Sequence, residues 1–195
     1  VAVVVQPVAV AADAVHAGSH AVIATATGSG KSLALWLPTV SAILTAPAPT
    51  GSVAAMRRRP SALYLSPTKA LAADQLASLE RLLRGGAGDG DASGGSDLTG
   101  AVRVASCDGD TSFDERDWVR AHADVVLTNP DFLHFSLLPG HERWARLLRG
   151  LTHVIVDECH AYRGVFGAHV SLVLRRLLRL ARFYGADPVG GAASA

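Results

Sequence analysis

The chain has 195 residues, 49% of them hydrophobic and 18% charged, which excludes an intrinsically disordered protein and fits a single globular domain. The formal net charge of +1 neither supports nor excludes a nucleic-acid partner, so any such partner has to be inferred from particular residues. Cys107 and Cys159 are the only cysteines and do not form a C-x-x-C pattern, so we expect a reducing, cytoplasmic location without a disulfide or structural metal.

The opening segment, VAVVVQPVAVAADAV, begins with Val rather than Met, and we expect the natural chain to start further upstream. It has no basic residues ahead of its apolar run, which argues against a signal peptide. Residues 32–56 carry no charge, but three prolines interrupt them, and the strongly apolar part, 33–44, is too short to cross a bilayer. We therefore predict a buried helix there and no membrane association.

Five short apolar runs alternate with longer segments of helical period, which is typical of strands buried on both faces of a parallel sheet. These runs are HAVIAT (20–25), SALYLS (61–66), AVRVAS (101–106), DVVLTN (124–129) and THVIVD (152–157). Repeated strand–helix units of this length require right-handed crossovers and predict an α/β domain with a helix-covered sheet. The Gly/Asp/Ser-rich segment 85–100 has no period and is predicted to be a flexible surface insertion.

Apolar stripes and capping residues indicate where the helices lie. Ser112 and Glu115 have the spacing of a capping box. A helix over about 168–184 is expected to end at Gly185 and to expose its arginines at 175, 179 and 182 on a solvated face. The predicted buried stripes are Ala72, Leu76, Leu79 and Leu83; Trp144, Leu147 and Leu148, in a helix that ends at Gly150; and Val170, Val173, Leu174, Leu177 and Leu178.

The segment ATATGSGKS, between the first predicted strand and an apolar helix, has the composition of a phosphate-binding loop. Backbone amides approach phosphate closely only where side chains are small, and the two glycines meet this need. The lysine is expected to contact the β- and γ-phosphates and the final serine to bind Mg²⁺, with the positive end of the helix dipole behind them. Thr25 stands where the strict pattern has glycine, and an ordinary turn with an exposed lysine is the alternative. The predicted nucleotide-binding residues are Thr27, Gly28, Ser29, Gly30, Lys31 and Ser32.

The segment THVIVDECH places two carboxylates where a buried strand is expected to end. Asp157 would hold Mg²⁺, directly or through water, and Glu158 would polarise the attacking water. His160 would sense the γ-phosphate. With the loop upstream, these residues indicate hydrolysis of a nucleoside triphosphate, and a solvated strand end is the alternative. The predicted catalytic residues are Lys31, Asp157, Glu158 and His160.

The sequence DECH at 157–160 is similar to the D-E-x-H box of superfamily 2 helicases, and ATATGSGKS resembles their first motif. LSPTKALAADQ (65–75) resembles motif Ia, DGDT (108–111) a glycine–aspartate element, and TNPD (128–131) a further strand-contacting motif. Longer runs such as LPGHERWARLLRGLTHVIVDECHAYRGVFGAHV resemble the MrfA/Hrq-type branch. This resemblance implies a three-layer RecA-like P-loop NTPase domain with a mostly parallel sheet, which uses ATP and Mg²⁺ for 3′-to-5′ translocation on DNA in repair.

The same resemblance implies that motif Ia and TNPD contact the nucleic-acid backbone. Thr68 and Lys69 offer a hydroxyl, a cation and backbone amides to phosphate, and Thr128 and Asn129 do so from the next strand end. Phosphate contacts bind without sequence preference, as a motor requires. Lys69 as an ordinary surface lysine is the alternative, and the arginines at 57–59 are expected to be solubilising. The predicted nucleic-acid residues are Pro67, Thr68, Lys69, Thr128 and Asn129.

The last residues, VGGAASA, resemble the start of motif III of the superfamily, whose Ser-Ala-Thr would begin at Ser194 and lack its threonine. In the superfamily a strand leads to this motif, but Gly190 and Gly191 replace the bulky residues that strands prefer, which disfavours a strand here. The chain is thus expected to be one domain, residues 1–195, with a second RecA-like lobe of the full-length protein as its partner. That lobe supplies an arginine that stabilises the transferring phosphoryl group, so we expect slow hydrolysis by this lobe alone.

Other residues carry no assigned chemistry. Gln6 is a candidate for the adenine-reading glutamine of many such helicases, Tyr162–Gly164 resemble a family element, and both cysteines are expected to be packed. A small-molecule kinase would need an arginine-bearing lid and has little use for a D-E-x-H box. A nucleotide-gated binding module without unwinding activity is the other alternative.

Overall fold

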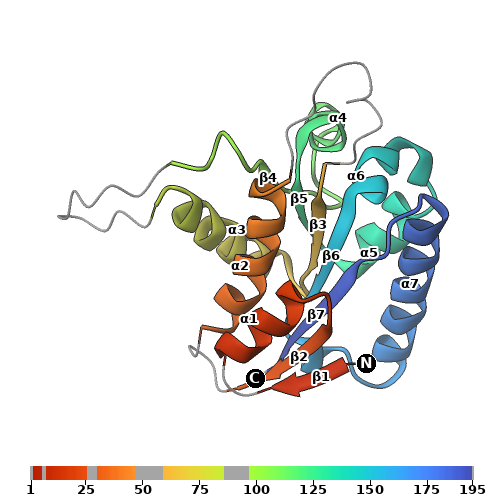
Figure 1. Cartoon of the computed structure of the whole chain (residues 1–195). Coiled ribbons are helices and arrows are strands. Elements are labelled where there is room, and N and C mark those ends of the chain that lie inside the picture. The colour runs from red at the N-terminus through yellow and green to blue at the C-terminus, as the bar shows by residue number, and fades with distance from the viewer. Residues whose placement is uncertain (1, 6–7, 26–29, 47–58, 86–96, 195) are drawn as a thin grey trace.

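The computed structural model of the chain describes residues 2–5, 8–25, 30–46, 59–85 and 97–194. Within this part, the chain forms one sheet with helices on both of its faces (Figure 1). Several residues on which sequence predictions rest lie outside it: Gln6, Thr27, Gly28, Ser29, Arg57, Arg58, Ala195 and most of the 85–100 insertion.

Seven strands form the sheet in the order β1-β2-β7-β6-β3-β5-β4, and every neighbouring pair is parallel. This confirms the predicted α/β fold with a parallel sheet. All five predicted strands are present, although the third of them covers only the second half of AVRVAS because residues 99–101 form a turn. The strands are β1 (Ala2–Val5), β2 (His20–Ala24), β3 (Ser61–Leu65), β4 (Val104–Ser106), β5 (Val125–Thr128), β6 (Leu151–Val156) and β7 (Val189–Ser194).

Two strands, β1 and β7, differ from the sequence prediction. The apolar opening pairs with β2, and β7 lies between β2 and β6, so the prediction that the glycines disfavour a strand at 189–194 is wrong. Close packing explains why glycine occupies this strand: a Cβ at Gly191 would lie 2.6 Å from Leu35 Cδ2 of helix α2 (Lys31–Leu44). Pairing on both edges and the close helix outweigh the low strand propensity of glycine.

The helices form a layer on each face of the sheet (Figure 1). Tyr64 and Leu63, adjacent in β3, belong to opposite core clusters, as the alternation of side chains along a strand requires. One face carries α1 (Val8–His16), α2 and α3 (Lys69–Leu83), and the other carries α4 (Phe113–His122), α6 (Ala145–Gly150) and α7 (Gly164–Phe183). Shorter turns are α5 (Pro130–Phe132), η2 (Leu133–Leu137), η3 (His141–Trp144) and η4 (Cys159–Ala161).

The predicted capping residues are confirmed at two helices. Ser112 and Glu115 form a reciprocal capping box at α4. Gly185, with a φ of 78°, follows α7, which begins at Gly164 rather than at the predicted 168. Gly150 ends α6 for another reason, because a Cβ there would lie 2.0 Å from a backbone carbonyl oxygen that precedes β3.

Helix α2 is buried on one side only, which corrects the prediction of a buried helix. Leu35 and Trp36 are each 2% exposed, whereas Leu33 and Leu37 are 43% and 49% exposed. Among the residues that the structure describes, we find no helix with the length and hydropathy needed to cross a membrane.

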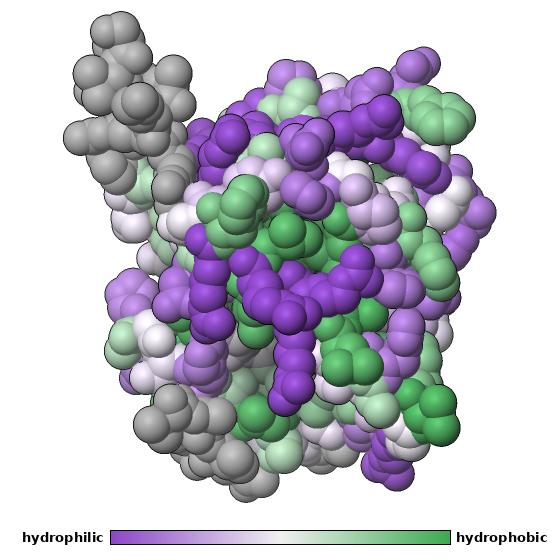
Figure 2. Space-filling view, turned by 90° about the vertical axis from the view of Figure 1, so that its right-hand side faces the viewer, coloured by the Kyte–Doolittle hydropathy of each residue, from purple (hydrophilic) through white to green (hydrophobic). Residues whose placement is uncertain are grey.

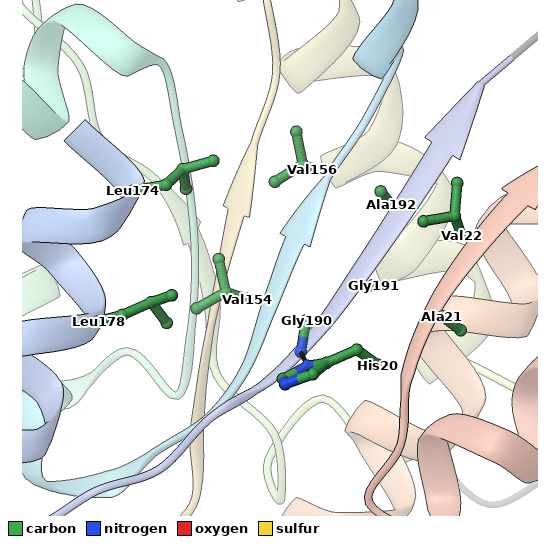
Figure 3. Close-up of a pocket in the computed structure, with 10 residues that line it drawn as sticks. All are labelled: His20, Ala21, Val22, Val154, Val156, Leu174, Leu178, Gly190, Gly191 and Ala192. Carbon is green, nitrogen blue, oxygen red and sulfur yellow. Dashed lines mark hydrogen bonds between the residues drawn. The ribbon is translucent and has the colours of Figure 1, made fainter. Parts of the chain in front are cut away.

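The α7 side of the sheet is covered incompletely. A hollow of about 300 Å³ lies between Leu174 and Leu178 of α7 and the strands β2, β6 and β7 (Figure 3). His20 accepts the Gly190 amide at 2.8 Å at its edge. Hydrophilic residues cross the outer face on this side, between hydrophobic patches (Figure 2). The α7 arginines at 175, 179 and 182 are exposed, which confirms the predicted solvated face.

Asp124, directly before β5, is a fully buried carboxylate. Arg59 donates to both of its oxygens, at 2.7 and 3.0 Å, and the Arg103 amide donates at 3.1 Å. The guanidinium groups of Arg103 and Arg146 lie 3.6 and 3.8 Å away. Arg59 therefore ties the segment before β3 to β5, and the prediction that it is a solubilising residue is wrong.

Replacing Asp124 with Ala should lower the free energy of unfolding by about 3 kcal/mol, because three arginines then lose their buried counter-charge. Asp117→Ala is the control, since the Asp117 side chain is 72% exposed and pairs with Arg120 in a surface contact worth less than about 1 kcal/mol. Urea denaturation of both variants measures the difference. Equal stability of the two variants would contradict the structural role of Asp124.

Candidate nucleotide and nucleic-acid sites

The carboxyl ends of parallel strands meet at one edge of a sheet, where ligands of α/β proteins usually bind. In this sheet, β2 leads toward α2, β7 ends at Ser194, and β6 is followed by Asp157 and Glu158. Because β7 lies between β2 and β6, a single strand separates the predicted phosphate loop from the predicted acids.

Lys31 lies at the centre of this edge. It is 8% exposed, and its ammonium donates to the carbonyl oxygens of Thr25, at 2.6 Å, and Ser194, at 3.1 Å. Gly30 precedes it with a φ of 81°, a left-handed conformation that favours glycine. Lys31 and Ser32 begin α2, so their amides are among those that a helix leaves available for an anion. Their role in nucleotide binding stays a prediction.

The Asp157 carboxylate is buried and held from two sides. Its Oδ1 accepts the Glu158 amide at 2.9 Å, and its Oδ2 accepts the hydroxyl of Tyr64 from neighbouring β3. The Asp157 amide donates to the Leu65 carbonyl at 2.9 Å, which continues the β3–β6 pairing past the strand end. Burial, and then the charge of Asp157, raise the pKa of Tyr64 far above its ordinary value, so the hydroxyl stays a donor.

Glu158 has a φ of 46° and is the one non-glycine residue with a positive φ in the part of the chain that the structure describes. This conformation costs about 1–3 kcal/mol and clusters at functional sites. The Glu158 carboxylate lies 3.0 Å from His160 Nδ1, which is 3.4 Å from Ser194 Oγ. Ser194 therefore connects these residues to Lys31, and the structure brings the four predicted catalytic residues to one edge.

These groups fit a nucleoside triphosphate with its Mg²⁺. Mg²⁺ prefers oxygen ligands and is usually held by one or two carboxylates together with substrate phosphates. Hydrogen bonds occupy about two of the four lone-pair positions of Asp157, which leaves room for the ion or its water, and Ser32 stands in the first turn of α2. Within the described ranges, no cluster of three His, Cys, Asp or Glu side chains could hold a metal.

The predicted motif Ia residues follow β3 at the same edge. Thr68 caps α3 by accepting the Leu71 amide at 3.2 Å, and Thr68 and Lys69 are exposed. The Lys69 ammonium bonds to Asp110 and lies 3.7 Å from Asp108, both of the DGDT element. The cation of this surface is therefore already paired with carboxylates, which would repel phosphate.

Thr128 and Asn129, at the end of β5, make contacts within the protein. The Thr128 hydroxyl donates to the Cys107 carbonyl at 2.7 Å and the residue is 2% exposed, so it does not present the solvent-facing hydroxyl that the sequence predicted. Asn129 is half-buried, and its Oδ1 accepts the Phe132 amide at 2.8 Å. Of the two, Asn129 stays a candidate for a nucleic-acid contact.

Cys107 is fully buried, as predicted, and burial raises the pKa of its thiol to about 11.

Sequence reasoning missed Tyr64 and Trp36. Both lie in apolar segments and are residue types that are common in protein cores, so the sequence alone does not mark them. Their rings stack at a centroid distance of 5.0 Å.

The glycines of the YRGVFG run indicated a close backbone approach, since a Cβ at Gly167 would lie 2.3 Å from the Tyr162 carbonyl oxygen. The Tyr162 hydroxyl is buried and has no hydrogen-bond partner among the described residues. Burial, and then the charge of Asp157, raise the pKa of this hydroxyl.

A family model described as DEAD/DEAH box helicase matches residues 7–186 of this chain. The chain belongs to the DEAD/DEAH box helicase family. This helicase domain is 40% identical over 175 residues to the uncharacterized ATP-dependent helicase YprA of Bacillus subtilis, and 41% identical over 170 residues to the ATP-dependent helicase HRQ1 of Saccharomyces cerevisiae. These matches cover 90% and 87% of the chain but 20% and 14% of the relatives, so the chain spans a fifth or less of their length.

Solved structures give the same assignment. The crystal structure of the DUF1998 helicase MrfA bound to DNA and AMPPNP has a TM-score of 0.79 and 39% identity over 95% of this chain and 23% of that one. The helicase Lhr of Mycobacterium smegmatis bound to ssDNA and AMP-PNP has a TM-score of 0.67 and 29% identity over 96% of this chain and 22% of that one. The resemblance to MrfA/Hrq-type helicases and the RecA-like three-layer fold are therefore confirmed.

Replacing Lys31 with Ala in this helicase domain should weaken ATP binding about 10- to 100-fold, because hydrogen bonds to charged groups contribute about 1.5–3 kcal/mol. Anisotropy of a fluorescent ATP analogue measures the affinity. Lys31→Arg is the conservative control and should keep part of the binding, since it retains the charge but not the compact ammonium. Unchanged affinity in Lys31→Ala would rule out the predicted phosphate loop.

Replacing Asp110 with Ala should raise the affinity for single-stranded DNA about 3- to 10-fold at low salt, because Lys69 becomes available and a charge that repels phosphate is lost. Anisotropy of a labelled oligonucleotide at two salt concentrations measures the effect. Asp187→Ala is the matched control: Asp187 also pairs with a basic side chain, that of Arg182, but lies before β7, at the opposite edge. Weaker DNA binding by Asp110→Ala would show instead that the ion pair is needed to form the surface.

Proposed function

We propose that the chain is the ATP-binding motor lobe of an ATP-dependent DNA helicase, which couples ATP hydrolysis to 3′-to-5′ translocation on DNA in repair. The observation that carries the proposal is the shared edge, where Lys31 contacts Ser194 and Ser194 contacts His160 of the DECH segment. A phosphate cradle beside two acids is what hydrolysis requires. Membership of the DEAD/DEAH box helicases supports the use of that hydrolysis in a motor.

In this proposal, Lys31 and the first amides of α2 bind the triphosphate, and Lys31 exchanges its two carbonyl contacts for phosphate oxygens. Mg²⁺, when bound, neutralises charge on the phosphates. Asp157 orients the ion or its water. Glu158 accepts a proton from the attacking water as that oxygen bonds to the γ-phosphorus and the bond to ADP breaks. His160 holds the Glu158 carboxylate beside the γ-phosphate.

DNA is the proposed polymer partner. Thr68 and Lys69 are exposed at the edge that carries the predicted nucleotide-binding residues. A DNA strand bound there would therefore lie beside the site of hydrolysis. Contacts to phosphate from a hydroxyl, an ammonium and helix amides bind any sequence. The MrfA and Lhr structures that the chain resembles both contain DNA, which supports DNA as the substrate class.

A second RecA-like lobe of the full-length protein is the other proposed partner. The chain covers 14–23% of the relatives named above, so those proteins have room for further lobes. A second lobe would add the arginine that stabilises charge on the transferring phosphoryl group, which contributes about 10³–10⁵ in rate. This lobe by itself is therefore expected to bind ATP weakly and to hydrolyse it slowly.

Replacing Glu158 with Gln in the full-length protein should keep ATP affinity within about twofold and lower DNA-stimulated hydrolysis by about 100-fold or more, because the general base is lost. Phosphate release with and without DNA measures the rate. Glu142→Gln, at an exposed position in η3, is the control and should hydrolyse normally. Unchanged hydrolysis in Glu158→Gln would show that another residue is the general base. If the unmodified protein associates with a partner in an ATP-dependent way but does not hydrolyse ATP, the binding-module alternative is favoured.

A further inference from the structure

A buried series of contacts runs from α2 to the end of β6. Trp36 and Tyr64 are each 2% exposed, and their rings stack at 5.0 Å with an interplanar angle of 20°. The Tyr64 hydroxyl donates to Asp157 Oδ2. We propose that these contacts set the position of the Asp157 carboxylate relative to Ser32, so that Tyr64 is a positioning residue for the Mg²⁺ that accompanies the nucleotide. This inference rests on the proposed function and deepens it.

The register of the sheet places Tyr64 on the side where it can reach Asp157. Tyr64 pairs with Ile155 across β3 and β6, and both belong to the core cluster beneath α2. Side chains two residues apart on a strand share a face, so Asp157 points to the same face as Ile155. The tyrosine is the residue type whose ring fills this core position while its hydroxyl reaches the strand end.

Trp36 connects Tyr64 to the phosphate-loop helix. It follows Ser32 by four residues, so the two side chains share one side of α2 and lie about 6 Å apart along its axis. The Trp36 indole nitrogen has no hydrogen-bond partner within the described ranges, so its contact with Tyr64 is one of packing. Because interiors are close-packed, a shift of α2 that moves Ser32 also displaces Trp36 and Tyr64. The two predicted ligands of Mg²⁺ are therefore mechanically connected.

A purely structural role for Tyr64 predicts a different result when its hydroxyl is removed. If Asp157 served only as a hydrogen-bond partner for a buried hydroxyl, the loss of that hydroxyl would change stability and leave the response to Mg²⁺ unaltered. If the hydroxyl orients the carboxylate, its loss weakens the response to Mg²⁺ specifically. The ring itself stays in place in Tyr64→Phe, so this variant separates the two roles.

The test measures binding of a fluorescent non-hydrolysable ATP analogue to the full-length protein during titration with Mg²⁺. In Tyr64→Phe, the midpoint of the Mg²⁺ titration should rise about tenfold, while nucleotide affinity in EDTA stays within about twofold of the unmodified protein. Trp36→Leu, which removes the stacked ring, should raise the midpoint in the same direction. Tyr184→Phe is the matched control, because it removes a hydroxyl that bonds His141 Nδ1 at 2.8 Å and should leave the midpoint unchanged.

Each outcome decides a separate point. An unchanged midpoint in Tyr64→Phe, with normal binding in EDTA, would overturn the inference while leaving the proposed function intact. Loss of the folded state in Tyr64→Phe, seen by circular dichroism, would also overturn it, since the hydroxyl would then be required for folding. If the affinity for the ATP analogue changes neither with Mg²⁺ nor when Lys31→Ala is the sole substitution, the proposed function itself is overturned.

Discussion

One ammonium group joins three segments of the predicted nucleotide-binding edge, which is the edge where β2, β7 and β6 end. Lys31 leaves the first turn of α2 and bonds the carbonyl oxygens that follow β2 and end β7, although Ser194 is 163 residues away in sequence. A buried cation is costly unless polar groups surround it, so the two carbonyls satisfy Lys31 and at the same time fix α2 against the sheet. The strand order makes this contact possible, because β7 lies between β2 and β6 and brings the acids of β6 to within one strand of the lysine.

The same edge carries two predicted binding surfaces that differ in the charges around their lysines. At the nucleotide surface, the cation Lys31 faces neutral carbonyl dipoles and Asp157 accepts bonds from neutral donors. At the nucleic-acid surface, Lys69 faces the full charges of Asp108 and Asp110. In the proposed function, a triphosphate would therefore replace carbonyl dipoles at Lys31, whereas a DNA phosphate would compete with two carboxylates at Lys69.

Local patterns predicted most of the fold, and tertiary contacts explain the errors. The apolar runs of the parallel strands and the capping box at Ser112 are properties of neighbouring residues, and the structure has them. The strand at 189–194 could not be predicted, because its glycines reflect the close approach of Leu35 from another element. In the site, Lys31 and the DECH segment belong to contiguous sequence patterns, and the structure places them at one edge of the sheet. The buried hydroxyl of Thr128 and the contact of Tyr64 with Asp157 depend on strands far apart in sequence, which no local pattern reports.

The position of β7 also constrains how the protein is made. Strands β1 and β2 join the rest of the sheet only through β7, so the sheet cannot be completed until that segment has left the ribosome. Without β7, the facing edges of β2 and β6 would have unpaired amides and carbonyls, which are templates for pairing with other chains. The predicted nucleotide-binding edge therefore cannot form before β7 is in place, because its lysine and its acids lie on opposite sides of the gap that β7 fills.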